Sequence, residues 1–189
     1  ILELVHFRKR IAISWHSSLI DLSMAEIDIR KNLNGKWRNQ LKKAEKSSIE
    51  FKDDKSDSSF FWLLDSYEQM MKDKSYKGPS VDLYKGYYAI DNNNHFVFQA
   101  WLDGEAVAGI LILRHGTSCT YQIGWNNPNG RKVYANNLLL WNAVLEMKKC
   151  GCLWFDMGGI DKENTPEIAN YKYGLEGQEY TMVGEWISF

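Results

Sequence analysis

The feature that most restricts the fold is a pair of apolar runs joined by Asp103-Gly104. Residues 95–102 and 106–113 are rich in β-branched and aromatic types, and an Asp-Gly pair favours the positive φ angles of a tight hairpin turn. Gly116-Thr117 marks a second turn into residues 120–124. The three segments predict an antiparallel meander.

Helical patterns dominate the chain before this meander. Ser23 and Glu26 have the spacing of a capping box, which predicts a short helix that Gly35 interrupts. The next helix carries one apolar stripe, made of Trp37, Leu41 and Ala44. A longer helix, capped by Ser56 or Asp57, has a wide apolar face of Phe60, Phe61, Leu64, Tyr67, Met70 and Met71. We also expect strands over residues 11–22 and 49–53, and a helix over residues 81–90.

After the meander the pattern alternates between helix and strand. We expect a loop over residues 126–134, helices over 135–149 and 166–173, and strands over 153–156 and 179–187. Helices gathered early, a meander and a strand-helix-strand ending predict an α+β domain whose mixed, mostly antiparallel central sheet is flanked by helices. A length of 189 residues suits one domain over residues 1–189.

Composition and charge exclude several classes of protein. With 44% hydrophobic and 14% aromatic residues the chain is not disordered, and a net charge of -1 argues against a globally basic nucleic-acid binder. Cys119, Cys150 and Cys152 lack metal-ligand spacing and are interpreted as core thiols of a cytoplasmic protein. No run is long enough for a transmembrane segment. The start at Ile1 suggests a fragment of a longer chain. No metal is expected, because the histidines show no ligand spacing (His6, His16, His95 and His115).

Basic residues concentrate in one segment. Residues 30–46 hold seven Lys or Arg and one acid, Glu45. Such a face, which includes Lys36 and Arg38, suits the phosphates of tRNA or of a nucleotide-linked sugar, and Trp37 could stack on a base or sugar. The alternative is the solvated side of an amphipathic helix. A smaller basic group, Arg131 and Lys132, lies in the 126–134 loop.

The last third of the chain resembles a known family. The runs Tyr134-Ala-Asn-Asn-Leu-Leu-Leu-Trp141, Trp154-Phe-Asp-Met-Gly-Gly159, Tyr171-Lys-Tyr-Gly174 and Val183-Gly-Glu-Trp186 follow the order and spacing of the Fem-type aminoacyltransferases, which build peptidoglycan bridges and have the GNAT N-acyltransferase fold. The same signature extends to Fem-like acetyltransferase domains of envelope polysaccharide pathways. The resemblance is specific in this last third and loose before residue 95.

The resemblance implies an acyl donor used as a cosubstrate, either aminoacyl-tRNA or acetyl-CoA, with no tightly bound cofactor. The acceptor would be an amine on a nucleotide-sugar or lipid-linked cell-wall or polysaccharide precursor. Two departures matter: Fem-type enzymes usually hold two such domains in tandem, and the 129–135 segment lacks the glycine-rich pattern that binds the pyrophosphate of coenzyme A.

Lys172 is the sharpest candidate for chemistry. The resemblance places it at the family's aromatic-Lys pair, whose lysine contacts the activated acyl end of the donor, and a fixed ammonium stabilises an oxyanion electrostatically. The alternative is a solvated lysine on a helix. Tyr171 would line the donor site or pack in the core. Tyr134 and Asn136, in the first run of the resemblance, are expected to contact substrate.

Two carboxylates are further candidates. Asp156 ends a strand and precedes Gly158-Gly159, so it could deprotonate or orient an amine, or it could cap the following turn. Glu185 lies among apolar neighbours in an expected strand, which is typical of a functional acid but also of an exposed edge strand.

Three functions follow from these residues. The first is an N-acyltransferase in which Lys172 stabilises the oxyanion and Asp156 or Glu185 takes or relays the proton. The second is a non-catalytic half of a tandem protein that binds a precursor or tRNA. The third is an acetyl-CoA acetyltransferase that acts on a small amine.

Overall fold

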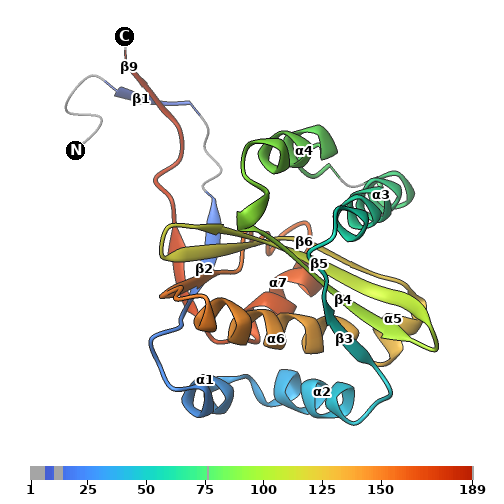
Figure 1. The fold of residues 1–189 in the computed structure, drawn as a ribbon. Coiled ribbons are helices and arrows are strands. Elements are labelled where there is room, and N and C mark those ends of the chain that lie inside the picture. Colours follow the sequence, from blue (N-terminus) through green and yellow to red (C-terminus); the bar gives the residue numbers. More distant parts are fainter. Residues whose placement is uncertain (1–6, 11–14, 76, 189) are drawn as a thin grey trace.

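A seven-stranded sheet forms the centre of the protein (Figure 1). The computed structural model describes residues 7–10, 15–75 and 77–188. The strands follow the order β3-β4-β5-β6-β7-β2-β8, and every neighbouring pair is antiparallel except β6 and β7. The strands are β2 (His16–Asp21), β3 (Glu50–Asp53), β4 (His95–Leu102), β5 (Glu105–His115), β6 (Ser118–Asn126), β7 (Trp154–Asp156) and β8 (Gln178–Thr181). The α+β class with a mixed, mostly antiparallel sheet is confirmed.

The predicted meander is formed by β4, β5 and β6. Asp103 and Gly104 have φ angles of 52° and 83°, as the Asp-Gly turn requires. The partner segment is longer than expected, because β5 extends to His115. A register shift between Leu111 and Ile112 leaves β6 with one extra residue, since their partners are Ile123 and Tyr121.

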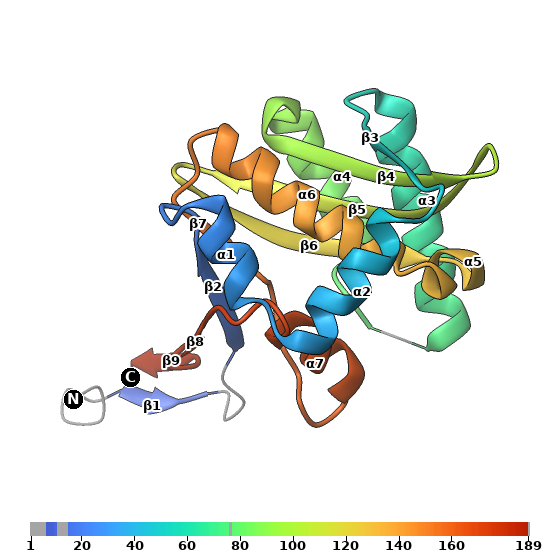
Figure 2. The ribbon, with the colours of Figure 1, turned by 90° about the horizontal axis from the view of Figure 1, so that it is seen from below.

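Helices cover both faces of the sheet. Figure 1 shows α3 (Asp57–Lys74) and α4 (Val81–Ile90) on one face, and α6 (Ala135–Lys149) and α7 (Pro166–Tyr173) on the other. Below α6 lie α1 (Glu26–Asn32) and α2 (Gly35–Glu45), as the view from below also shows (Figure 2). The helix α6 is therefore covered by the sheet on one side and by α2 on the other.

Each face of the sheet has its own apolar cluster. The larger cluster joins the sheet to α6, α1, α2 and α7, and it contains the predicted stripe of Trp37, Leu41 and Ala44. The smaller cluster joins the sheet to α3 and α4 through Phe60, Leu64 and other residues. Of the expected α3 face, Phe61 is exposed, whereas Leu63, which the pattern did not single out, is fully buried.

Several local predictions are wrong. Ser23 does not cap α1, because its amide and hydroxyl both donate to Asp21, and the helix begins only after Ala25. The expected 126–134 loop contains a short helix, α5 (Pro128–Lys132), with Asn127 as its N-cap. The strand expected over residues 153–156 is buried only at Phe155, since Leu153 and Trp154 are exposed.

The strand expected over residues 179–187 is two strands. After β8 the chain turns at Gly184, whose φ is 86°, and β9 (Trp186–Ser188) pairs with β1 (Phe7–Lys9) in a separate two-stranded sheet. This ribbon projects away from the body of the protein (Figure 1).

The three cysteines are free thiols. Cys119 and Cys152 are buried as expected, whereas Cys150 is only partly buried. Burial raises the pKa of the Cys119 thiol. Across the described ranges, no helix is long and apolar enough to cross a bilayer.

Candidate functional site

The candidate site lies where β6 and β7 diverge. The two parallel strands pair only from Ser118–Thr120 to Trp154–Asp156. From Tyr121 onward β6 continues toward Asn126, while the other strand ends and the chain enters Gly158-Gly159.

Lys172 reaches this point from α7. It is only 8% exposed, and its Nζ donates a hydrogen bond to the carbonyl oxygen of Gly159 at 2.7 Å. The ammonium also lies 5.4 Å from the ring centroid of Tyr121. Burial lowers the pKa of Lys172 to about 8, against an opposing effect of the Asp156 charge. The solvated-lysine interpretation is therefore wrong, because this side chain is buried among site residues.

Asp156 ends β7 beside Lys172 and is held by three donors. Its Oδ1 accepts from the Gly158 amide at 2.7 Å and from the Ser17 hydroxyl at 2.5 Å. That hydroxyl also lies 2.7 Å from the Gly158 carbonyl oxygen, so its one proton is shared between the two acceptors. Its Oδ2 accepts from the Tyr180 hydroxyl at 2.6 Å. The bond to Gly158 shows that Asp156 caps the following turn, as one of the two interpretations proposed, while its charge still acts on Lys172.

Two glycines allow the turn to pack tightly. A Cβ on Gly158 would lie 2.4 Å from the carbonyl oxygen of Tyr121, and one on Gly159 would lie 2.7 Å from the ring of Trp15. Gly158 also has a φ of 67°, which disfavours other residues. The backbone after β7 is thus pressed against β6 and brings Gly159 to Lys172.

Tyr171 links α7 to α6. Its hydroxyl donates to the carbonyl oxygen of Asn136 at 2.8 Å, and burial raises its pKa well above the ordinary value. Its ring packs at 6.1 Å from the Trp37 ring. Of the two interpretations, core packing describes the side chain as the structure places it.

Trp37 does not offer a stacking surface. It is 3% exposed and packs against Tyr171 and the backbone of Gly174. The expectation that it stacks on a base or sugar is corrected, because α2 turns this side chain toward the core and turns Lys36 outward.

The N-terminus of α6 is the second part of the site. Tyr134 precedes it in the left-handed conformation, with φ of 58°, and no side chain caps the helix. The Nζ of Lys43 lies 5.7 Å from the Tyr134 ring centroid, and Gln40 accepts from Asn137, so α2 flanks this end of α6. The Oδ1 atom of Asn136 is buried with no hydrogen-bond partner among the described residues. Tyr134 and Asn136 are therefore brought together here.

The backbone amides of the short helix α5 donate to acceptors within the same segment. Gly130 donates to the Asn127 side chain at 2.8 Å, and the amides of Arg131, Val133 and Tyr134 donate to carbonyls within the segment. Arg131 itself donates to the Asn126 carbonyl. At α6, in contrast, no side chain caps the helix, and its first amides carry the positive end of the helix dipole.

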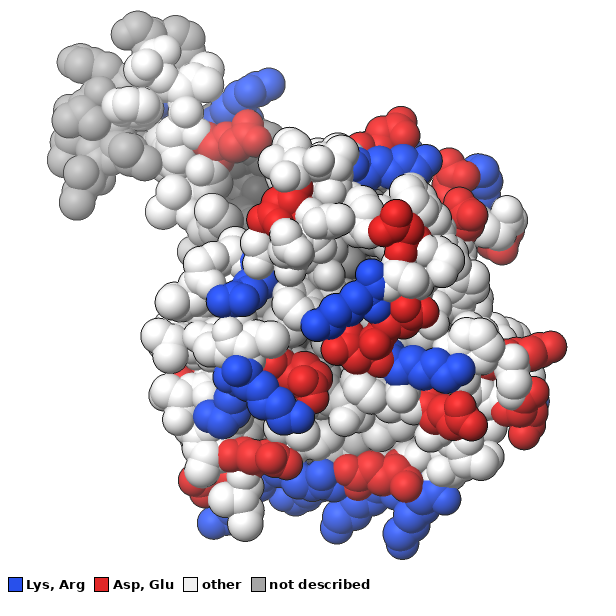
Figure 3. Space-filling model, viewed as in Figure 1, with Lys and Arg blue, Asp and Glu red and all other residues white. Residues whose placement is uncertain are grey.

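The basic residues of the 30–46 segment form an exposed edge. In Figure 3, Lys and Arg side chains project along the lower edge of the molecule, where α1 and α2 lie in Figure 1, with acidic side chains between them. Lys36, Lys42 and Lys43 are exposed. Arg30 pairs with Glu45 at 2.6 Å, and Arg38 donates to the Lys31 carbonyl, so these two guanidinium groups have protein partners.

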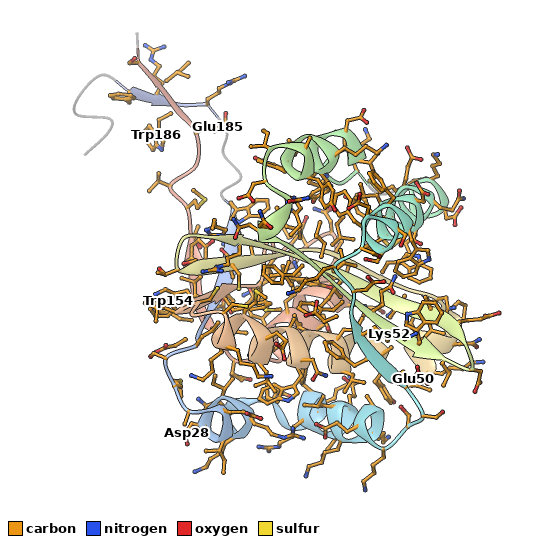
Figure 4. The ribbon with its side chains drawn as sticks, viewed as in Figure 1. Asp28, Glu50, Lys52, Trp154, Glu185 and Trp186 are labelled. Carbon is orange, nitrogen blue, oxygen red and sulfur yellow. The ribbon has the colours of Figure 1, made fainter. Side chains whose placement is uncertain are left out.

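Glu185 lies outside this constellation. It belongs to the segment that leads into β9, where Figure 4 shows it beside Trp186 and away from the body. Its side chain is 57% exposed and lies 3.6 Å from the guanidinium of Arg10. The predicted apolar environment is corrected, because the chain leaves the central sheet after Thr181, before it reaches Glu185.

Sequence reasoning missed Ser17, Tyr121 and Tyr180. Ser17 lies within a segment expected to be a strand, and that position was the one signal available; the structure shows that it is 1% exposed, where a hydroxyl needs a partner. Tyr121 and Tyr180 had no comparable signal, since their roles depend on pairings between distant segments. Within the described ranges, no group of His, Cys, Asp and Glu residues could hold a metal ion.

Comparison with known proteins gives one family match. Residues 30–173 match the family described as "Acetyltransferase (GNAT) domain". No curated protein matches the sequence.

Solved structures share the fold at low sequence identity. FemX is 11% identical with a TM-score of 0.78, covering 98% of this chain and 66% of that one. L-PGS from Bacillus licheniformis is 15% identical with a TM-score of 0.60, covering 95% and 61%. The aminoglycoside acetyltransferase meta-AAC0020 from an uncultured soil metagenomic sample is 17% identical with a TM-score of 0.52, covering 75% and 95%. The chain thus spans less than two thirds of the length of FemX and L-PGS.

Proposed function

The chain belongs to the GNAT acetyltransferase family, and from that membership we propose that it is an N-acyltransferase with its reaction centre at Lys172. An amine would attack the acyl carbonyl of an activated donor directly. The carbonyl oxygen would become an oxyanion, the donor's thiolate or ribose oxygen would leave, and the amine nitrogen would lose a proton. No covalent intermediate with the protein is required.

The observation that carries this proposal is the buried ammonium at the divergence of β6 and β7. An ammonium has three N–H groups, and within the described part of the chain Lys172 uses one of them, on Gly159. The other two can donate to a developing oxyanion in surroundings from which water is largely excluded. There, a positioned donor contributes more than it would in water.

The donor is proposed to place its phosphates at the N-terminus of α6. The uncapped amides attract an anion, and Lys43 stands beside Tyr134. Arg131 and Lys132 are exposed nearby in sequence. Both candidate donors, acyl-CoA and aminoacyl-tRNA, carry phosphates that this end of the helix would accept.

Asp156 is proposed to attract the acceptor amine. The carboxylate, oriented by its hydrogen-bond donors, would attract an acceptor that arrives as an ammonium and orient its nitrogen, which must lose a proton before it attacks the acyl carbon. Proton removal by Asp156 remains a second role for the same group. Glu185 is left out of the proposed machinery because of its place beside β9.

We propose an acceptor amine on a cell-wall or envelope polysaccharide precursor, in a cytoplasmic setting. The run of residues shared with Fem-type enzymes supports the acceptor class, and three free thiols suit a reducing compartment. A second GNAT domain in a longer chain would complete the Fem arrangement.

A donor-by-acceptor assay tests the function. The purified protein would be incubated with labelled acetyl-CoA or aminoacyl-tRNA and a panel of amines, including nucleotide-sugar peptides and amino sugars. Lys172→Met should lower the rate about 100-fold or more, as the loss of an oxyanion donor does. The matched control is Lys162→Met, an exposed lysine paired with Glu179, which should keep full activity. Full activity of Lys172→Met would refute the assignment.

The exposed basic edge of α2 favours a second candidate function. The chain would then bind tRNA or a phosphate-bearing precursor and leave chemistry to a partner domain. Salt-sensitive binding of such a polyanion, with no transfer by any donor tested, would identify this alternative.

A further inference from the structure

Asp156 lies beside a buried ammonium without pairing with it. The Asp156 charge raises the pKa of Lys172, so the two groups interact electrostatically. Yet none of the ion pairs formed by the described residues joins them. Opposite charges attract strongly where water is scarce, so something must hold the carboxylate back.

The restraint comes from two hydroxyl groups on neighbouring strands. Ser17 of β2 and Tyr180 of β8 are cross-strand partners. The Tyr180 hydroxyl donates to Asp156 Oδ2, and the Ser17 hydroxyl shares its one proton between Asp156 Oδ1 and the Gly158 carbonyl oxygen. Leu19 of β2 is in turn the partner of Asp156 itself. The antiparallel pairing of β2 with both of its neighbours therefore sets where the carboxylate lies.

An unrestrained carboxylate would change what Lys172 can do. If Oδ2 lost the Tyr180 hydroxyl, it would lack its hydrogen-bond donor, and the Lys172 ammonium is the cation with which its charge already interacts. A direct ion pair would then use N–H groups that are otherwise available to a bound molecule.

We propose that Tyr180, together with Ser17, is a positioning residue that restrains Asp156 and thereby keeps Lys172 available to a substrate oxygen. The catalytic consequence rests on the proposed acyl transfer, but the restraint is a property of the protein alone.

The groups that face Lys172 are few. Asp156 approaches from β7, the Tyr121 ring from β6 and the Gly159 carbonyl from the turn after β7. Tyr180 acts from β8 through Asp156. Burial raises the pKa of Tyr121 and holds its phenol neutral. Burial and the Asp156 hydrogen bond raise the pKa of Tyr180 to about 12. Asp156 is therefore the charge that a change at Tyr180 would move.

An NMR titration of the lysine side chain tests the restraint without any substrate. The protein would carry ¹³C-labelled lysine, with the Lys172 Cε signal assigned by Lys172→Arg. In Tyr180→Phe the titration midpoint should rise from about 8, by about one pH unit, because Asp156 closes on the ammonium. In Asp156→Asn the midpoint should fall. In the Asp156→Asn background, Tyr180→Phe should change nothing further.

The chain offers a matched control. Tyr88 donates to Asp57 at 2.5 Å, a tyrosine-aspartate bond on the opposite face of the sheet. Tyr88→Phe should leave the Lys172 midpoint unchanged. An unchanged or lower midpoint in folded Tyr180→Phe would overturn the proposal. If that variant does not fold, Ser17→Ala removes one of the two donors to Oδ1 and should raise the midpoint in the same direction.

The activity measurement separates this inference from the proposed function. With a working assay, Tyr180→Phe should lower kcat/KM, and its loss of rate at alkaline pH should move to higher pH, as the midpoint does. A raised midpoint in a protein whose Lys172→Met variant keeps full activity would support the restraint and contradict the proposed chemistry.

Discussion

Gly158 and Tyr121 approach so closely that a Cβ on the glycine would lie 2.4 Å from the tyrosine carbonyl oxygen. The contact joins the turn after β7 to β6 just where the two strands stop pairing. Because the Gly158 amide also donates to Asp156, the contact fixes the carboxylate and the neighbouring Gly159 carbonyl together. The position of the Lys172 ammonium therefore depends on the absence of a side chain at residue 158.

Gly158→Ala should destabilise the protein by roughly 2 kcal/mol or more, since it combines a left-handed backbone with a clash against backbone. Denaturant unfolding measures the change. The matched control is Gly86→Ala in α4, where a Cβ meets nothing within 4 Å. That substitution should stabilise by about 0.5–1 kcal/mol through helix propensity. Equal stabilities of the two variants would contradict the close approach.

The buried ammonium of Lys172 should make stability depend on pH. Its folded-state pKa is lowered to about 8 from 10.5, so between these values the unfolded chain binds more protons. The contribution of this group to the free energy of unfolding should therefore rise with pH across that window, by on the order of 3 kcal/mol. Below about pH 8, where Lys172 is charged in both states, the protein should bear the whole of this destabilisation.

The measurement compares the wild type with Lys172→Met, which removes the titrating group and keeps an apolar stem. The variant should be the more stable protein near pH 7, and its advantage should shrink as the pH rises toward 10. A difference that stays constant with pH would show that Lys172 titrates normally in the folded state.

Local patterns predicted most elements, because each depends on neighbours in sequence. The α4 and α6 boundaries and the Asp103-Gly104 turn follow from periodicity and turn chemistry alone. Ser23 failed as a cap because Asp21 competes for its hydroxyl. Strand 179–187 failed because one glycine, Gly184, redirects the chain into a different sheet.

The site could be predicted only in part. The run Tyr171-Lys172 pointed to the ammonium, but nothing local indicated that it would be buried. The insertion of β2 between β7 and β8 brings Ser17 and Tyr180 to Asp156, and such pairing between distant segments leaves no trace in a local pattern. Glu185 has apolar neighbours in the sequence, but the structure places its side chain in an exposed position away from Lys172.

Trp37→Ala should act on stability rather than on ligand binding. The side chain is 3% exposed and packs on Tyr171, so its removal should cost about 3–5 kcal/mol. Trp154→Ala, at a position that is 37% exposed, should cost less. Thermal and denaturant unfolding compare the two. If Trp37→Ala left the stability unchanged and weakened the binding of a polyanion, Trp37 would stack on the ligand and the interpretation as a core residue would be wrong.

The exposed lysines of α2 should carry salt-dependent binding of a phosphate-bearing donor. Lys36 and Lys43 are exposed, and Lys43 stands beside Tyr134 at the uncapped end of α6. The pair Lys36→Ala/Lys43→Ala should weaken binding of tRNA or acyl-CoA. It should also reduce the slope of log K against log salt by about 0.7 for each single-strand phosphate that these lysines neutralise in the wild type. The control pair is Lys74→Ala/Lys85→Ala, which removes exposed lysines from the opposite face of the sheet. It should leave both the affinity and the salt slope unchanged. Fluorescence anisotropy at several salt concentrations gives both quantities. Equal weakening in the two pairs would show that the attraction is diffuse, and that the end of α6 is not where the phosphates bind.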